Sequence, residues 1–382
     1  MVIQKRLNSI YSKKKNISRF FYANRIFYHD KTYDEKEKTF FNNLYKEWWG
    51  TKSDSYLDIF KKVVGKNIYS LHDYNKNRFD FLCKNWEFLN YEKMKKKEKI
   101  NIQPINLNIL DVGCGGGILC EYIKNNIFYF LNKNNFCMSH HINNNENSSI
   151  NTINVFIHGI DISDKLINVA NQRIKESNEE EKKQKTDLIT SYCYDPLYKQ
   201  IITNNIKTNC KQETHISEED KKSKRFDKKY LVNINVKYTK CDIIDLQNAN
   251  NENNPLKYDI IICSEVIEHV PNEKKKKFIH AISQLCNHMS LVIFTSINKS
   301  YQSYVYAILL AEHVFGFLKK GTHDYEKFID TEELSDICSH FNLRNLTNEY
   351  VFYVPFIRKY IPENKMKLLY MSSFAYNKKN NE

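Results

Sequence analysis

The sequence has no cysteines at C-x-x-C spacing and no long apolar run. Its ten cysteines are scattered over 382 residues. This excludes a zinc ribbon and argues against a disulfide framework, so a reducing compartment fits best. The nearest candidate for a membrane span, Tyr304 to Leu318, is interrupted by Glu312 and His313. It is also shorter than the ~20 residues that cross a bilayer. The sequence therefore predicts no transmembrane helix.

Acidic residues are absent from the first 29 positions. Seven of the 13 net positive charges lie there, on Lys5, Arg6, Lys13, Lys14, Lys15, Arg19 and Arg25. A basic, acid-free segment with interspersed serines is typical of a mitochondrial transit peptide. The alternatives are a disordered basic tail or an arm that binds nucleic acid. We expect residues 1–38 to be a transit peptide and linker, and residues 39–376 to form the domain.

Two segments of that domain have the composition of inserted loops. Residues 124–154 and 176–233 are rich in Asn and Lys and have few periodic apolar positions, as mobile surface loops do. Hydrophobic residues make up 41% of the whole chain, which is enough for a sizeable core. Outside the two segments, strands and helices alternate, which predicts an α/β fold with a parallel sheet. The expected strands are 109–112, 155–160, 234–239, 258–263 and 289–295, and the later expected helices are 163–175 and 272–287.

A glycine cluster follows the first expected strand, in the sequence ILDVGCGGGIL from Ile109 to Leu119. Glycines at such a turn allow positive φ and let the backbone approach a ligand closely. A turn of this kind binds either phosphate or the methionine and ribose parts of S-adenosylmethionine. Ile118 replaces the third glycine of G-x-G-x-x-G, which weakens the dinucleotide interpretation. The next strand ends at Asp161, which is placed to bind a ribose diol.

A second cluster lies where the strand 258–263 leads toward a helix, in the sequence CSEVIEHVP. Glu265, Glu268 and His269 recur at i, i+3 and i+4, so a helix would place them on one face. Two carboxylates and an imidazole suit a divalent cation. The alternative is a pair of acids at a helix N-terminus and a packed histidine.

The two clusters are expected to meet at one edge of the sheet. Gly113, Asp161, Asp242 and Ser264 all fall at or just past strand ends, where open α/β sheets bind ligands. Asp242 is a candidate for the adenine edge of a cofactor, or else a turn residue. This convergence predicts a single active site.

LDVGCGGGIL, GIDIS and CSEVIEHVP together resemble the class I S-adenosylmethionine-dependent methyltransferases. Three more stretches are similar to the O-methyltransferases of ubiquinone biosynthesis. They are FNNLYKEWW followed by LHDYNKNR, then TSINKS, and then KKGTHDYEKFI. The resemblance covers about residues 40 to 356 without the two segments. Phe352-Tyr353-Val354-Pro355 departs from the family's usual H-Y-N-P.

The resemblance implies a class I methyltransferase (Rossmann-like) mostly parallel sheet with helices on both faces. It also implies an N-terminal helical cap carrying Trp48, Trp49 and Arg78. S-adenosylmethionine and Mg²⁺ are the implied cofactors. The implied site residues are Arg78, Gly113, Asp161 and Ser264 for the methyl donor, Glu265, Glu268 and His269 for magnesium, and His323 as a proton acceptor, a further metal ligand or a loop cap.

The implied reaction is methylation of a ring hydroxyl on a polyprenylated precursor of ubiquinone. Magnesium would lower the pKa of a phenol, which is otherwise near 10. The expected setting is the matrix side of the inner mitochondrial membrane, in association with other ubiquinone-biosynthesis proteins and without nucleic acid. Tyr304 to Leu318 would be an apolar lid toward lipid, or an ordinary core helix.

Two other functions compete with this interpretation. A small-RNA 2′-O-methyltransferase shares an E-x-x-E-H metal site and would suit a basic chain. A non-catalytic binding or assembly protein would keep the fold without turnover. The motifs WW, LHDYNKNR and KGTHD favour the quinone family over the first, and the intact glycine cluster argues against the second.

Overall fold

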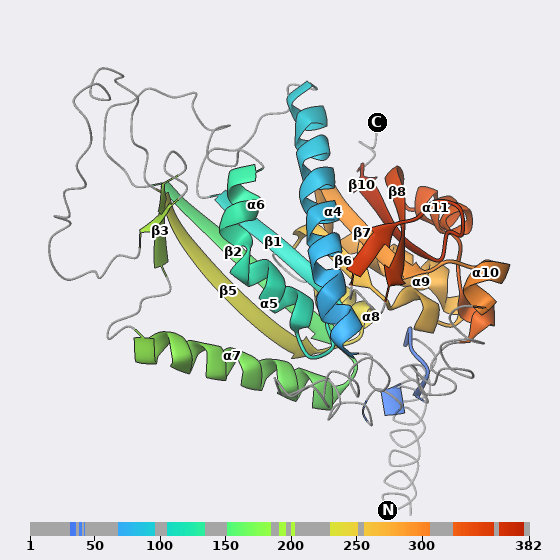
Figure 1. Ribbon diagram of the computed structural model, residues 1–382, viewed down its shortest axis with the longest axis horizontal. Helices are drawn as coiled ribbons and strands as arrows, with labels where there is room; N and C mark the ends of the chain where they lie inside the picture. Colours follow the sequence, from blue (N-terminus) through green and yellow to red (C-terminus); the bar gives the residue numbers. More distant parts are fainter. Residues whose placement is uncertain are drawn as a thin grey trace, which may run out of the picture.

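The computed structural model describes residues 31–35, 38, 39, 42, 68–95, 105–133, 151–184, 191–195, 200–202, 230–250, 256–305, 324–354 and 359–377. Its centre is a ten-stranded sheet with the order β4-β3-β5-β2-β1-β6-β7-β10-β8-β9 (Figure 1). The strands are β1 (Ile105–Val112), β2 (Asn151–Asp161), β3 (Ser191–Asp195), β4 (Gln200–Ile202), β5 (Tyr230–Lys240), β6 (Tyr258–Ser264), β7 (Cys286–Ile297), β8 (Leu343–Val354), β9 (Lys359–Pro362) and β10 (Leu369–Tyr376).

The middle of the sheet is parallel and both of its sides are antiparallel. Strands β5, β2, β1, β6 and β7 run parallel to one another. Strand β10 is antiparallel to β7 and β8, and β3 is antiparallel to β5 and β4. The predicted parallel α/β core is therefore confirmed, within a sheet that is mixed as a whole. Because parallel strands end on the same side, β1, β2, β5 and β6 present their carboxyl ends at one edge.

Helices cover both faces of this sheet. The helices are α4 (Ile68–Lys95), α5 (Ile118–Asn125), α6 (Ile127–Lys133), α7 (Asp164–Gln184), α8 (Ile243–Ala249), α9 (Asn272–Leu285), the short α10 (Tyr301–Ser303) and α11 (Thr331–Ser339), with 3-10 turns η2 (Ile267–His269) and η4 (Tyr325–Lys327). One hydrophobic cluster joins α4, α5, α6 and α7 to one face. A second cluster joins α8, α9 and α11 to the other face.

Strand β6 shows how the sequence builds both cores. Ile260 and Ile262 lie in the first cluster, whereas Ile261 and Cys263 lie in the second. Successive side chains of a strand point to opposite faces, so a strand buried on both sides needs a continuous apolar run. The run from Ile260 to Cys263 meets that requirement.

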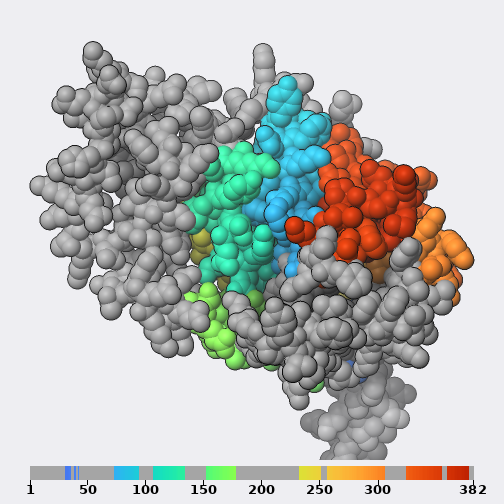
Figure 2. Space-filling view, in the orientation of Figure 1, coloured from blue at the N-terminus to red at the C-terminus, as the bar shows by residue number. Residues whose placement is uncertain are grey.

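Helix α4 belongs to one of these layers and carries Arg78. Between α5 and α6 on one side and the region of β8 and β10 on the other, α4 forms part of the surface (Figure 2). Its residues Phe81, Leu82 and Leu89 are buried in the first hydrophobic cluster. This is the part of the predicted N-terminal cap that the structure describes, since Trp48 and Trp49 lie outside the described residues.

The two predicted insertions contain helices and strands. Segment 124–154 contains α6 and the first residues of β2, because Ile127, Phe130 and Leu131 form a buried apolar face. Segment 176–233 contains the end of α7, strands β3 and β4, and the start of β5. The interpretation of both segments as loops throughout is therefore wrong at these places. Residues 134–150 and 203–229 lie outside the described residues. Among the residues described, no helix combines the length and apolar character required to cross a bilayer.

A buried histidine ties β2 to its surroundings. His158 lies 2.7 Å through Nδ1 from the Tyr258 hydroxyl and 2.9 Å through Nε2 from Thr239 Oγ1. Burial lowers the pKa of His158 to about 4. The imidazole is therefore neutral in the folded protein at neutral pH.

We expect His158 to make the protein sensitive to acid. Between pH 6.5 and 4, His158 is protonated in the unfolded state, where its pKa is near 6.5, but stays neutral in the folded state. The free energy of unfolding therefore falls as the pH drops from 6.5 to 4. The loss reaches about 3 kcal/mol. Urea denaturation at several pH values measures it. The His158→Gln variant should lack this component. Buried acids with raised pKa values change the stability in the opposite direction. The contribution of His158 is therefore the difference between the wild-type and variant free energies of unfolding at each pH. Identical pH dependence in the two proteins would contradict this prediction.

Candidate active site at the carboxyl edge of the sheet

The glycine cluster forms a tight turn between β1 and α5. Gly113, Gly115 and Gly117 have φ values of 73°, 54° and 78°, in the region that side chains rarely adopt. A Cβ on Gly113 would lie 2.3 Å from Val266 Cγ2, and one on Gly117 would lie 2.4 Å from the Tyr238 hydroxyl. The turn therefore requires glycine for both its backbone conformation and its packing.

Asp161 holds this turn in place from the end of β2. Its Oδ2 accepts a hydrogen bond from Gly115 N at 2.9 Å, and its Oδ1 accepts one from Ser163 N at 2.8 Å. Burial raises the pKa of Asp161 to about 6, against these backbone hydrogen bonds. A carboxylate has about four acceptor positions, so Asp161 can also accept a hydrogen bond from a ligand. Gly113 N donates to Ile160 O, next to Asp161, at 2.8 Å, so the structure places Gly113 and Asp161 at one edge, and their role in binding stays a prediction.

A second buried acid lies under the turn. Asp111, on β1, is 2% exposed, and its Oδ2 accepts a hydrogen bond from the Cys120 thiol at 3.2 Å. Burial raises the pKa of Asp111 to about 7. Sequence reasoning passed over Asp111, although its position two residues before Gly113 was visible.

Arg78 reaches the same edge from α4. It is 6% exposed, its guanidinium lies 4.3 Å from the centre of the Tyr74 ring, and Nη2 is 3.5 Å from Glu265 Oε1. Within the described part of the chain, Nε and Nη2 have no hydrogen-bond partner, and neither does Ser264 Oγ at the end of β6. Buried donors without acceptors are costly. An anionic group such as a carboxylate would satisfy the guanidinium.

The segment CSEVIEHVP does not form the expected helical face. Glu265 has a φ of 54°, residues 267–269 form only a 3-10 turn, and α9 begins at Asn272 after Pro271. Proline disfavours a helical conformation in the residue before it, and Val270 is extended with a ψ of 126°. The prediction that these residues share a helical face is therefore wrong.

The two glutamates are held by neighbouring residues of β7. Thr295 Oγ1 donates to Glu265 Oε1 at 2.7 Å, and Ser296 Oγ donates to Glu268 Oε2 at 2.9 Å. Each carboxylate therefore has its own hydroxyl donor on β7. Sequence reasoning quoted Thr295 and Ser296 only as a motif and missed this role.

The residues as placed do not fit the predicted magnesium site. Among the described residues, no three histidine, cysteine, aspartate or glutamate side chains are grouped so that they could hold a metal ion. Glu268 is 2% exposed and bonded to Ser296, and Glu265 contacts Thr295 and Arg78. His269 lies beside them in sequence without completing a ligand set.

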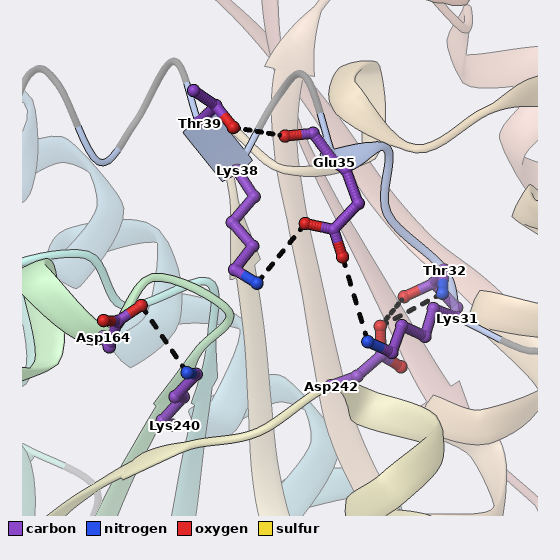
Figure 3. Close-up of polar contacts among 8 residues, drawn as sticks. All are labelled: Lys31, Thr32, Glu35, Lys38, Thr39, Asp164, Lys240 and Asp242. Atoms are coloured by element: carbon purple, nitrogen blue, oxygen red, sulfur yellow. Dashed lines mark hydrogen bonds and ion pairs between the residues drawn. The ribbon is translucent and has the colours of Figure 1, made fainter. Parts of the chain in front are cut away.

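Asp242 begins helix α8. Its Oδ1 accepts a hydrogen bond from Ile244 N at 2.8 Å, as a helix N-cap does. Its Oδ2 accepts two more, from Thr32 N at 3.0 Å and Thr32 Oγ1 at 2.7 Å (Figure 3). Asp242 is therefore a helix N-cap, and its predicted contact with the adenine edge stays a prediction. Thr32 is 4% exposed, so the expected linker up to residue 38 contacts the domain already at Thr32.

Several predicted features lie outside the described residues. His323, Trp48 and Trp49 are among them, as is most of the apolar stretch Tyr304 to Leu318. Their roles stay predictions.

Known proteins are similar to this chain along most of its length. A family model described as "Methyltransferase domain" matches residues 74–348, more than half of the chain. A protein named ubiquinone biosynthesis O-methyltransferase from Azoarcus sp. is 32% identical over 123 residues, which are 32% of this chain and 52% of the relative. Its namesake from Coxiella burnetii is 30% identical over 143 residues, 37% of this chain and 58% of the relative. These matches span about half the length of the relatives.

A longer alignment exists with the protein of that name from Aromatoleum aromaticum, which is 24% identical over 338 residues. It covers 88% of this chain and 94% of the relative. The resemblance stated from the motifs is thus confirmed.

Among solved structures, magnesium protoporphyrin IX methyltransferase from Synechocystis PCC 6803 is 10% identical, covers 89% of this chain and 100% of its own, and has a TM-score of 0.40. The plantazolicin methyltransferase is 13% identical, covers 90% and 98%, and has a TM-score of 0.39. At these TM-scores the likeness supports no further conclusion. The family match, together with the glycine turn held by an acid at the end of β2, shows that the chain belongs to the methyltransferase-domain family.

Proposed function

We propose that this chain transfers a methyl group from S-adenosylmethionine to a ring hydroxyl of a polyprenylated benzoid intermediate in ubiquinone biosynthesis. The observation that carries the proposal is the alignment over 94% of a relative with the name ubiquinone biosynthesis O-methyltransferase. The geometry of the edge supports the donor half. The glycine turn lets a ligand approach the backbone, Asp161 offers acceptors for a ribose diol, and Arg78 offers unused donors for a carboxylate.

The acceptor must lose a proton as its oxygen attacks the methyl group. A neutral phenol near pKa 10 is a poor nucleophile at neutral pH, so a group beside the acceptor oxygen has to take this proton. Glu265 lies 3.5 Å from the Arg78 guanidinium, next to the proposed donor pocket. Arg78 and Asp161 bind and orient the donor.

We expect labelled S-adenosylmethionine to transfer its methyl group to a catechol precursor with a short prenyl tail. The readout is radioactivity in the organic extract. The Asp161→Ala variant serves as the donor-site control, and a small RNA serves as the competing acceptor. Transfer to RNA with none to the catechol would replace this proposal by the RNA-modifying alternative. Binding of S-adenosylmethionine without transfer to either acceptor would favour a non-catalytic role.

The same assay tests the magnesium dependence that the resemblance implies. A loss of turnover on chelation that Mg²⁺ restores would mean that Glu265, Glu268 and His269 rearrange into a ligand set when the metal binds. Unchanged turnover by metal-free protein would contradict the dependence and leave the glutamates with Thr295, Ser296 and Arg78 as their partners.

We further propose that the protein acts on the matrix side of the inner mitochondrial membrane, beside other proteins of the pathway. The support is the acid-free basic segment at residues 1–29 and the lipid tail of the proposed substrate. Fractionation of cells that express the chain without residues 1–29 tests whether this segment directs the protein to mitochondria. Import of the truncated chain into mitochondria would contradict that role.

A further inference from the structure

We propose that Tyr74 is a positioning residue of the methyl-donor site, and that its ring holds the Arg78 guanidinium where the carboxylate of the donor binds. The two residues are one turn apart on α4, at i and i+4, so their side chains lie on the same face of the helix. This inference rests on the proposed function, which supplies the ligand of Arg78.

The guanidinium of Arg78 is buried but makes only long polar contacts with the described residues. Nη1 lies 3.4 Å from Asn75 Oδ1, and Nη2 lies 3.5 Å from Glu265 Oε1, whereas an N–H···O hydrogen bond is typically about 2.9 Å long. Nε and Nη2 have no hydrogen-bond partner in this part of the chain. Polar contacts of this length fix the orientation of a guanidinium poorly, so another group has to hold it.

The ring of Tyr74 makes the close contact. The central carbon of the guanidinium lies over this ring, 4.3 Å from its centre, and Tyr74 is 1% exposed. An aromatic face attracts a cation most strongly where water is excluded. The attraction needs no acceptor atom, so Nε and Nη2 of Arg78 can still bind a carboxylate.

Tyr360 of β9 supports the Tyr74 ring from behind. The two ring centres are 4.1 Å apart and the rings are inclined by 18°. At these distances two groups cannot occupy the same face of one ring, so Arg78 and Tyr360 lie on opposite faces of Tyr74. Tyr360 also contacts Tyr353, its cross-strand partner on β8, with the ring centres 4.7 Å apart. The guanidinium and the three tyrosines therefore form a column.

Strands β8 and β9 are bonded to the same turn of α4. The Tyr353 hydroxyl donates to Asp73 Oδ2 at 3.2 Å, and Asn77 Nδ2 donates to Tyr360 O at 3.4 Å. Tyr353, Tyr360 and Asp73 also take part in further interactions. The strands therefore have support of their own, and Tyr74 is the residue that transmits it to the guanidinium.

The column ends at the edge where the proposed function places the donor. Glu265, which lies 3.5 Å from Arg78, follows β6. Burial raises the pKa of Asp111 to about 7, and the Cys120 thiol and the charge of Arg78 oppose this rise. The guanidinium thus acts on groups at the ends of β6 and β1, which are neighbours in the sheet. The glycine turn begins two residues after Asp111.

The test compares two ligands by isothermal titration calorimetry. S-adenosylhomocysteine carries the amino-acid carboxylate, whereas 5′-methylthioadenosine keeps the nucleoside and the sulfur but lacks that group. Tyr74→Leu removes the aromatic face and keeps the position apolar. We expect it to raise the Kd of S-adenosylhomocysteine about tenfold and to leave the Kd of 5′-methylthioadenosine unchanged. Tyr74→Phe keeps the ring and should bind both ligands as the wild type does.

Two further variants separate positioning from packing. Phe79→Leu is the matched control, because Phe79 is buried beside Arg78 in the sequence but contacts Tyr122 and Phe130. It should lower the Tm through lost packing and leave the ratio of the two Kd values unchanged. Arg78→Met removes the guanidinium, so adding Tyr74→Leu to it should raise the Kd of S-adenosylhomocysteine no further.

The outcomes distinguish this inference from the proposed function. Equal weakening of both ligands in Tyr74→Leu would make Tyr74 a structural residue, and unchanged binding would remove it from the site. Either result overturns the inference while the wild type still binds S-adenosylhomocysteine. A wild type that fails to bind this ligand overturns both. If Tyr74→Leu does not fold, Tyr360→Leu gives the answer: it should weaken S-adenosylhomocysteine selectively, and an unchanged ratio of Kd values overturns the inference.

Discussion

Replacing Gly113 with alanine is expected to destabilise the protein strongly. The new Cβ would be forced to a φ of 73°, which costs about 1–2 kcal/mol for a residue with a side chain. It would also lie 2.3 Å from Val266 Cγ2, and overpacking a well-filled site costs typically about 1–3 kcal/mol. Together these effects predict a fall in Tm on the order of 10 °C, measured by thermal denaturation.

The double variant Gly113→Ala with Val266→Ala separates the two causes. Removing the valine methyl groups relieves the contact but leaves the backbone conformation strained. Gly113→Ala should therefore lower the Tm less in the Val266→Ala background than in the wild-type protein. An unchanged Tm in Gly113→Ala would show that the turn tolerates a side chain. Neither backbone strain nor the contact with Val266 would then explain glycine at this position.

Replacing Asp161 with asparagine is expected to weaken S-adenosylhomocysteine binding about 100-fold. The amide keeps one acceptor, so one of the two backbone donors, Gly115 N or Ser163 N, would face an NH₂ group. Loss of a charged hydrogen bond costs about 1.5–3 kcal/mol, and 100-fold corresponds to about 2.7 kcal/mol. Isothermal titration calorimetry measures the effect. Asp164→Asn is the matched control, because that carboxylate is 51% exposed and pairs only with Lys240 among the ion pairs of the rim.

The pH dependence gives the same residue a second test. The pKa of Asp161 is raised to about 6, and the charged form accepts hydrogen bonds from a diol. Affinity in the wild type should therefore fall as pH is lowered through 6, and this fall should be absent in Asp161→Asn. If the affinity depends on pH in the same way in both proteins, a group other than Asp161 titrates. Asp111, with a pKa of about 7, is then a candidate.

The geometry of the proposed donor site, the glycine turn beside Asp161, could be predicted from sequence because its determinants are local. Gly113 follows β1 directly and Asp161 ends β2. Adjacent parallel strands finish at the same edge, so knowing that two strands are neighbours places their ends together. The glycine turn and the apolar strands around it can therefore be predicted from the sequence alone.

The arrangement of Glu265, Glu268 and His269 could not be predicted from the sequence, because the prediction assumed a helix that does not form at these residues. The spacing of Glu265, Glu268 and His269 matched one helical face, but Pro271 delays α9 to Asn272. What then decided the direction of each carboxylate was its partner on β7, Thr295 or Ser296. Those partners lie about 30 positions away, and no periodicity within CSEVIEHVP reports them.

By itself, the sequence determined the five parallel strands, the glycine turn, the acid at the end of β2 and membership of the methyltransferase family, because each depends on residues close together in the chain. Only the tertiary structure decided which residues of β7 bind the two glutamates, that Asp242 caps α8, and that Thr32 donates two hydrogen bonds to Asp242 from 210 positions away. These contacts join segments that the chain keeps far apart, and folding of the sheet brings them together at one edge.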